Sequence, residues 1–455
     1  MVVTPRRALA LVGGCAALAA LSLVVPWSLA FDPQAWVVWG RDALRWELDT
    51  SSGPSWKPLP VLVTTPLAIT GDAAPALWLV VARTGALLAL AGAAAVAWRL
   101  GGAVAAPTAA LVMAVSPWWA YNAALGNSEG LLAAAVLWAI AAHLHGRLHA
   151  ALALGVVAAL LRPEVWPFLG IYGLWLWRGG EVDRRALVAA AVAVPLLWLG
   201  PDLLGIGGAV GASHAARGEA SPGSAGREAI PGLAVLGDAA TRLSLPALFA
   251  AVFGAVLGPR AARWLALGAL GWVVLVAVMA QAGYAGNPRY LVTAAAVGCA
   301  LAGVGVARLA ALGTGAPRGR VAAAGAVVLV AAVALVALPD LRSQRRELGV
   351  RSDRRAELPN LIAAAGGRAE LVACSRIRTA GDTRALVAWE LDLPMLDLDA
   401  TPRAPAVLLR WEPLRRRELE PPLGPDADEF ERLARVPGWE AVAACGEAPQ
   451  VRPRQ

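Results

Sequence analysis

The charged residues of this chain that could carry chemistry stand at the ends of long apolar runs. Asp32 follows the first run, and Glu129 begins a later one. A carboxylate next to hydrocarbon is costly unless it has a partner or a task, so both are candidates for acid–base chemistry. The alternatives are structural: Asp32, with Pro33 after it, could cap the next helix, and Glu129 could complement the dipole of a helix N-terminus.

Basic residues at similar places are candidates for anion binding. Arg289 begins a late apolar run next to Tyr290, and its guanidinium could hold a phosphate by two parallel hydrogen bonds. Snorkelling of the side chain toward the membrane interface is the alternative. Lys57, the only lysine of the chain, lies in the first polar loop. We predict that Lys57, Arg289 and Tyr290 bind substrate.

Two further places complete the set of candidate binding residues. Arg162 and Glu164 lie between two short apolar runs, where they could contact a substrate or neutralise one another. His214 lies in a long loop rich in Gly, Ser and Pro, over 206–238. A loop of this length without apolar periodicity is typical of a segment that a substrate orders.

The composition predicts that membrane helices position these residues. The chain has 455 residues, of which 58% are hydrophobic and 16% charged, with a mean hydropathy of +0.59. A water-soluble protein of this length needs more polar surface, so a polytopic membrane protein is indicated. The net charge of +8 does not indicate nucleic-acid binding, because the basic residues are scattered in short clusters between apolar runs.

The apolar runs predict about eleven transmembrane helices, two of them short. They cover residues 8–30, 75–98, 103–120, 128–146, 149–161, 165–177, 186–205, 240–257, 264–283, 291–310 and 320–339. We interpret the first run as an uncleaved helix rather than a cleavable signal peptide.

Arginines in the short loops predict the orientation of the chain. With the N-terminus in the cytoplasm, every short inner loop carries Arg, as the positive-inside rule requires. The polar candidates then fall together on the outer face of the membrane. The outer segments are 31–72, 121–127, 162–164, 206–238 and 284–290, followed by the C-terminal part of the chain.

Three tryptophans in the first outer loop suggest a surface helix. Trp36, Trp39 and Trp46 follow a helical pattern, which predicts an amphipathic helix at the membrane surface. The alternative is an ordinary belt of interfacial aromatic residues.

After Pro339 the sequence becomes charged and contains no further spanning segment. We therefore predict an all-α transmembrane domain over 1–339 and a small soluble α/β domain, outside the cytoplasm, over 340–455. The patterns predict strands at 370–374, 406–410 and 440–445, and a helix that begins at 428–433.

The cysteines suggest one cross-link in this second domain. Cys374 and Cys445 each end a predicted strand, and an oxidising compartment would permit a disulfide between them. Two buried free thiols are the alternative. Cys15 and Cys299 lie in predicted helices as packing residues, and no Cys or His spacing is typical of zinc.

These features together resemble the GT-C superfamily of integral-membrane glycosyltransferases, which includes protein O-mannosyltransferases, aminoarabinose lipid A transferases and actinobacterial arabinosyl- and mannosyltransferases. The matching features are Asp32 after the first helix, Glu129 beyond the third, an outer loop with short helices, Arg289 at a late helix start, and a C-terminal outer domain. The resemblance covers about 340 residues and lies in layout more than in sequence motifs.

The resemblance implies an enzyme that moves a sugar from a polyprenyl-phosphate donor to a lipid, glycan or protein acceptor. It implies that Asp32 is the catalytic base or, with Glu129, a ligand of a divalent cation such as Mg or Mn. Arg289 and Lys57 would neutralise the leaving phosphate, and Glu129 would position the acceptor. Two other functions are open: a transporter, and a non-catalytic scaffold protein of the cell envelope. The scaffold would be indicated if Asp32 and Glu129 lay far apart.

Overall fold

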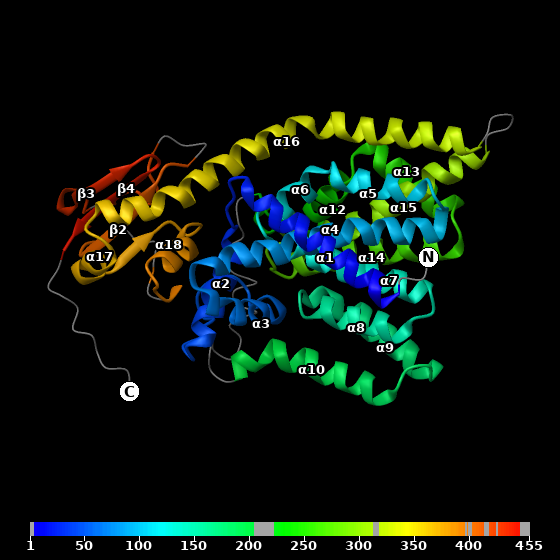
Figure 1. Ribbon diagram of the computed structural model, residues 1–455, viewed down its shortest axis with the longest axis horizontal. Helices are drawn as coiled ribbons and strands as arrows, with labels where there is room; N and C mark the ends of the chain where they lie inside the picture. The colour runs from blue at the N-terminus through cyan, green and yellow to red at the C-terminus, as the bar shows by residue number, and fades with distance from the viewer. Residues whose placement is uncertain are drawn as a thin grey trace.

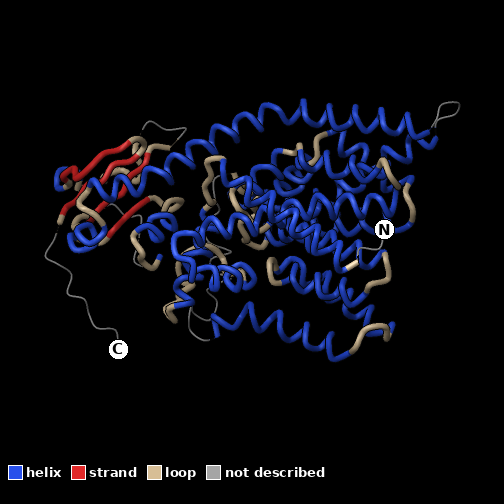
Figure 2. The backbone as a smooth tube through the Cα atoms, in the orientation of Figure 1, coloured by secondary structure: helices blue, strands red, loops and turns tan. Residues whose placement is uncertain are grey.

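The computed structural model describes residues 4–203, 223–312, 318–395, 398, 403–413, 418–424 and 426–445. A helical bundle occupies most of its length, and all strands lie in a small unit at one end (Figures 1 and 2). We call residues 365–445 within these ranges the C-terminal unit.

The bundle consists of apolar helices joined by short connections. Its elements up to residue 165 are α1 (Pro5–Leu21), η1 (Ser22–Val24), α2 (Phe31–Leu44), α3 (Pro58–Leu67), η2 (Ala68–Ala73), α4 (Ala74–Gly101), α5 (Ala105–Ala114), α6 (Pro117–Ala124), α7 (Glu129–Leu144), α8 (Leu148–Ala159) and η3 (Pro163–Val165). The remaining ones are α9 (Trp166–Gly179), α10 (Arg184–Leu203), η4 (Ala225–Arg227), α12 (Pro231–Arg242), α13 (Leu245–Leu257), α14 (Arg260–Gln281), η5 (Pro288–Leu291), α15 (Val292–Leu312) and α16 (Arg318–Ala364).

The helices follow the predicted apolar runs closely, but fewer helices than the eleven predicted are long enough to span a membrane alone. Within the described residues, six helical segments have the length and composition of a span, or eight when each of two bent pairs counts as one. The predicted run at 103–120 is divided between α5 and α6. The helices α8 and α9 have 12 and 14 residues, fewer than the roughly 20 that cross a bilayer.

Glycines bring the helices that carry candidate residues close to their neighbours. A Cβ at Gly303 or Gly305 of α15 would meet backbone atoms of α5 and α13, and a Cβ at Gly130 of α7 would meet the backbone of Ala86 in α4. Close backbone contact at small residues is the usual way in which membrane helices pack. The start of α7, which carries Glu129, is therefore held by a tightly packed neighbour, and so is helix α15, which follows the turn η5 that carries Arg289.

The long helix α16 changes the predicted boundary between the two domains. It has 47 residues and continues through Pro339 and Pro359 to Ala364. Figure 1 shows α16 running along one side of the bundle and into the C-terminal unit. The sequence change at Pro339 thus marks the point where the helix becomes polar, whereas the C-terminal fold begins after Ala364.

A four-stranded sheet forms the centre of the C-terminal unit. The strands β1 (Ile377–Thr379), β2 (Ala406–Trp411), β3 (Glu431–Val436) and β4 (Trp439–Ala444) lie in the order β1-β2-β4-β3. β1 pairs with β2 in parallel, and the other two pairings are antiparallel. Two short helices, α17 (Arg368–Cys374) and α18 (Arg384–Glu390), and the turn η7 (Ala427–Glu429) complete the unit.

Two predicted elements of the C-terminal unit were wrong. The run at 370–374 belongs to helix α17, which begins directly after Gly366 and Gly367 and includes the good helix formers Glu370, Leu371 and Ala373. The run at 428–433 enters strand β3 rather than a helix. Its pairing with β4 across a turn with Gly438 at positive φ overrides the local pattern. The predicted strands at 406–410 and 440–445 correspond to β2 and β4.

A disulfide joins Cys374 at the end of α17 to Cys445 after β4. This is the pairing expected from the sequence, although Cys374 follows a helix instead of a strand. Cys15 and Cys299 are free and buried in the bundle.

Helix α2 is buried in the protein rather than spread on a membrane surface. Trp36 and Trp39 are fully enclosed, whereas Trp46 just after the helix is 95% exposed. The prediction of an amphipathic surface helix was therefore wrong for the first two tryptophans. Their spacing places them in the core between α3, α4 and the C-terminal unit.

Candidate active site

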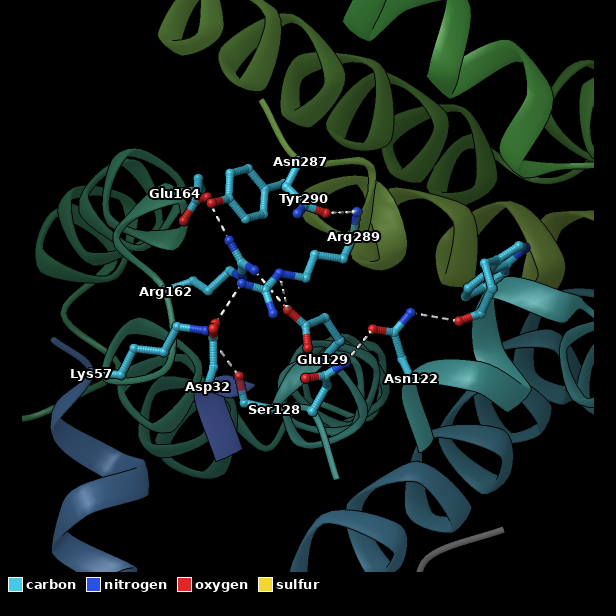
Figure 3. A network of polar contacts seen from close by, with 12 residues as sticks. Asp32, Lys57, Asn122, Ser128, Glu129, Arg162, Glu164, Asn287, Arg289 and Tyr290 are labelled. Carbon is cyan, nitrogen blue, oxygen red and sulfur yellow. Dashed lines mark hydrogen bonds and ion pairs between the residues drawn. The ribbon is translucent and has the colours of Figure 1, made fainter. Parts of the chain in front are cut away.

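Six charged side chains from distant parts of the chain meet at one end of the bundle (Figure 3). They come from the first turn of α2, the residue before α3, the start of α7, the connection between α8 and α9, and the turn η5 before α15. We call them the charged cluster; its members are Asp32, Lys57, Glu129, Arg162, Glu164 and Arg289.

The ion pair between Asp32 and Arg289 connects the first and the last parts of the cluster. Arg289 Nη2 donates to Asp32 Oδ2 at 2.5 Å, and both side chains remain partly exposed, at 22% and 13%. The Asn287 side chain accepts a hydrogen bond from the Arg289 backbone N–H, which fixes the turn before α15. Asp32 lies within the first turn of α2 while Ala30 occupies the N-cap, so Asp32 does not cap this helix.

Glu129 is the buried centre of the cluster. Its Oε1 accepts from Arg162 Nη2 at 2.7 Å and lies 3.8 Å from Arg289 Nε. Arg162 also donates to Glu164 at 3.0 Å, so these two do neutralise one another, but only as part of a larger group. Tyr290 stacks on Arg162, with the guanidinium carbon 4.1 Å from the ring centroid.

A sharp break between α6 and α7 places Glu129 at this point. The two helices meet at 117°. Asn127 donates to Asn122 Oδ1 at 2.9 Å, and Asn122 donates to the Trp118 carbonyl at 2.7 Å. These side-chain bonds connect the residues of the break to α6. Glu129 therefore begins α7 as the sequence predicted, and its carboxylate points into the cluster.

Lys57 approaches the cluster from the connection between α2 and α3. Its Nζ donates to Ser128 Oγ at 3.2 Å and lies 4.8 Å from the centroid of the Trp36 ring. Burial, followed by the positive charge of Arg162, lowers the pKa of Lys57 to about 7. A buried amine of this kind changes its charge close to neutral pH.

The cluster is balanced in charge but incomplete in hydrogen bonds. Three carboxylates face three cations in direct contact or nearby. Within the described residues, four buried polar atoms of the cluster have no hydrogen-bond partner: Glu129 Oε2, Glu164 Oε2, Arg162 Nε and Arg289 Nε. Such atoms are costly in a finished core, so this arrangement is typical of a site that a polar ligand completes.

A divalent cation between Asp32 and Glu129 fits these residues poorly. Arg289 already lies between the two carboxylates, and Arg162 contributes a second cation to Glu129. Among the residues that the structure describes, no three His, Cys, Asp or Glu side chains are grouped as a metal site would require. Asp32 and Glu129 thus have arginines where a metal site would place further carboxylates or imidazoles.

The structure brings together most of the site residues predicted from the sequence. Asp32, Lys57, Glu129, Arg162, Glu164, Arg289 and Tyr290 all take part in the cluster, whereas His214 lies outside the described residues. Asp32 and Glu129 contact the same arginine, which is not the arrangement expected of a scaffold with scattered polar residues. Ser128, Asn122 and Asn127 were not among the predicted site residues, although the polar break between two apolar runs was a signal for them.

Comparisons with known proteins identify the fold. No protein-family model and no curated protein matches the sequence. Solved structures match in three dimensions, and two of them are structures of ArnT. ArnT from Cupriavidus metallidurans bound to undecaprenyl phosphate has a TM-score of 0.63 at 16% identity, over 99% of this chain and 100% of that one. ArnT in the apo state has a TM-score of 0.61 at 16% identity, over 96% and 97%.

The fold is therefore that of the two ArnT structures, in agreement with the layout that the sequence resemblance suggested. The chain is similar to ArnT, an aminoarabinose lipid A transferase, along nearly its whole length. The many apolar helices and this fold make the chain a multi-pass membrane protein.

Proposed function

We propose that this protein is a glycosyltransferase that moves one sugar from a polyprenyl-phosphate donor to an acceptor hydroxyl at the extracytoplasmic face of a membrane. The observation that carries the proposal is the meeting of Asp32, Glu129 and Arg289 at the ends of apolar helices in a GT-C fold. The match to ArnT bound to undecaprenyl phosphate supports a lipid-linked donor.

Arg289 and Lys57 would receive the donor phosphate. Arg289 is partly exposed and can present its guanidinium to phosphate oxygens in a two-point contact, while Lys57 adds a point charge from the opposite side of the cluster. Positive charge placed there stabilises the phosphate as the bond to the sugar breaks. A phosphate that competes for Arg289 would also release Asp32 from its ion pair.

Asp32 would act as the general base. The acceptor oxygen forms a bond to the anomeric carbon, the bond between that carbon and the phosphate oxygen breaks, and polyprenyl phosphate leaves with the electron pair. The acceptor proton passes to Asp32. A single displacement of this kind inverts the anomeric configuration. Glu129 has a free Oε2 and would orient an acceptor or sugar hydroxyl.

An apolar cavity between α8, α9 and α10 supports a lipid chain beside this site. Its volume is about 380 Å³, and Trp166, Leu169 and Trp177 are among its lining residues. Trp166, which begins α9, lies two residues after Glu164, so the chain connects one end of this cavity to the charged cluster. A prenyl chain in the cavity with its phosphate at that end would direct the phosphate toward Arg289 and Lys57.

The positive-inside pattern supports an N-terminus in the cytoplasm, with the charged cluster and the C-terminal unit on the opposite face. The acceptor can then be a lipid, a glycan or a protein of the cell envelope. No nucleic acid is involved.

The direct test is to incubate the purified protein with a panel of polyprenyl-phosphate sugars and candidate acceptors, and to follow sugar transfer by mass spectrometry. We expect Asp32→Asn to reduce transfer by about a thousandfold, because the amide cannot accept the acceptor proton. Asp353→Asn, at an exposed position of α16, is the matched control and should retain full activity. Unchanged transfer by Asp32→Asn would refute the assignment of the base.

A further inference from the structure

The helix that carries Asp32 is joined at its other end to the C-terminal unit. Arg41, in the last turn of α2, is buried and donates to the carbonyl oxygens of Ala388 and Leu393, at 3.3 and 2.9 Å. It also pairs with its neighbour Asp42 at 2.9 Å. A guanidinium with several fixed acceptors is held in one position, because its donors have a rigid fork geometry.

Asp392 of the C-terminal unit completes this connection. Its carboxylate contacts Arg41 at 3.0 Å, Arg45 at 2.7 Å and Arg368 at 3.2 Å. Burial alone would raise the pKa of Asp392, but the hydrogen bond from Arg45 and the charges of the arginines lower it. The residue has a positive φ of 51°, a conformation that few side chains other than Asn and Asp adopt readily.

The start of α2 is contacted by the same part of the chain. The Arg355 guanidinium of α16 lies 3.6 Å from the centroid of the Trp27 ring, just before α2. The Arg384 guanidinium of α18 lies 5.9 Å from the ring of Phe31, the neighbour of Asp32. Residues of α16 and of the C-terminal unit therefore touch α2 or its connection at both ends.

The helix between these contacts is enclosed by the rest of the protein. All residues from Pro33 to Asp42 are buried, and Thr64 of α3 donates to the Trp36 carbonyl at 2.7 Å. Asp32 and Arg41 lie nine residues apart in one helix, which corresponds to about 13 Å. A shift of the helix at Arg41 is therefore transmitted to Asp32.

We propose that the C-terminal unit positions the catalytic carboxylate of Asp32 by holding helix α2, with Arg41 and Asp392 as positioning residues. Neither residue touches the charged cluster. Their effect on the reaction rests on the proposed function, whereas their effect on the placement of Asp32 does not.

The kinetic test compares two carboxylates of the C-terminal unit that each pair with more than one arginine. Asp392→Asn keeps the side-chain shape and the tolerance of positive φ but removes the charge that Arg41 and Arg45 share. We expect kcat to fall at least tenfold while the KM for donor stays within about twofold, because a misplaced base slows the reaction without changing the phosphate site. Glu440→Gln, whose carboxylate pairs within the sheet, is the control and should leave both constants unchanged.

A labelling experiment tests the placement of Asp32 without any substrate. In the full chain with Cys15→Ala, Cys299→Ala and Asp32→Cys, the rate of thiol alkylation reports the exposure of position 32. We expect the rate to rise several-fold when Asp392→Asn or Arg41→Lys is added, and to stay constant when Glu440→Gln is added. Arg41→Lys keeps the charge but loses the fork that reaches both carbonyl oxygens.

The outcomes separate the two proposals. If no variant transfers sugar, the proposed function fails, and the labelling rates alone decide the positioning role. Equal labelling rates with and without Asp392→Asn, together with an unchanged kcat, would overturn the positioning role. An equal rise with Glu440→Gln would also overturn it, because general loosening of the C-terminal unit would then explain the effect.

Discussion

Two glutamates of this protein are equally buried but differently satisfied. Glu129, in the charged cluster, is 1% exposed, and Glu440, in the sheet of the C-terminal unit, is 3% exposed. Both oxygens of Glu440 accept a hydrogen bond at 2.8 Å, one from Arg410 and the other from Arg432. In Glu129, the described contacts with arginine converge on Oε1, and Oε2 has no hydrogen-bond partner within the described residues.

The difference separates a structural ion pair from a site that binds. Arg410 also donates to the carbonyl oxygens of Pro421 and Leu419, so the group around Glu440 leaves nothing for a ligand. An incomplete cluster is less favourable for stability, because unpaired buried atoms keep their desolvation cost. The charged cluster therefore has the arrangement expected where stability is given up for substrate contacts.

The sharpest test of this comparison exchanges each glutamate for glutamine. We expect Glu129→Gln to lower kcat/KM by about a hundredfold, because the neutral amide orients the acceptor poorly. Without the charge of Glu129, Arg289 also pairs more tightly with Asp32. Glu440→Gln should instead cost about 3 kcal/mol in the free energy of unfolding, because two arginines lose a buried partner. Transfer assays and thermal unfolding of both variants measure the two effects. A large loss of stability in Glu129→Gln with normal activity would contradict the comparison.

The pH dependence of donor binding tests Lys57 as part of the incomplete cluster. Its pKa of about 7 means that the amine loses its charge as the pH rises above 7. We expect kcat/KM for donor to fall by up to about tenfold per pH unit above this value. Lys57→Arg remains charged, so its profile should lack this decline. The same decline in Lys57→Arg would assign it to another group.

The same pKa has a defined effect on stability. The pKa of Lys57 is lowered below its unfolded value of about 10.4. Between about pH 7 and 10 the unfolded chain therefore binds more protons, and the contribution of Lys57 to stability rises with pH in this window. Activity and stability should thus change in opposite directions, which distinguishes loss of phosphate binding from unfolding.

The smallest expected effect concerns the exposed partner of Glu440. The Arg432 side chain is 62% exposed, and Arg410 remains with Glu440 when Arg432 is removed. We expect Arg432→Ala to reduce the unfolding free energy by less than about 1 kcal/mol and to leave sugar transfer unchanged. Thermal unfolding measures this difference. If Arg432→Ala reduced the unfolding free energy as much as Glu440→Gln, the ion pairs of Glu440 would depend on the exposed Arg432.

Most of the bundle could be predicted from the sequence because apolar length is a strong signal. The starts of α7 and α15 were predicted within a few residues, and with them Glu129 in α7 and Arg289 in the turn η5 just before α15. Counting the predicted membrane spans places Asp32 and Arg289 on the same side of the membrane. Their direct contact did not follow, because it depends on the packing of helices far apart in the sequence.

The errors occurred where tertiary contacts decide between local alternatives. The run at 370–374 is too short for its apolar pattern to distinguish helix from strand, and β3 depends on its pairing with β4. Trp36 and Trp39 looked interfacial because nothing in the sequence shows that other helices and the C-terminal unit cover α2. For the same reason the connection between Arg41 and Asp392, 351 residues apart, gave no signal in the sequence.

The uninterrupted course of α16 has a geometric consequence. Its 47 residues extend about 70 Å along the helix, so a continuous helix rather than a flexible linker connects the C-terminal unit to the bundle. Each residue inserted into the polar half of α16 would rotate the C-terminal unit by about 100° around the helix axis and shift it by about 1.5 Å along that axis. The number of residues between Pro339 and Ala364 thus determines both the rotation around the α16 axis and the position along it at which Asp392 contacts helix α2.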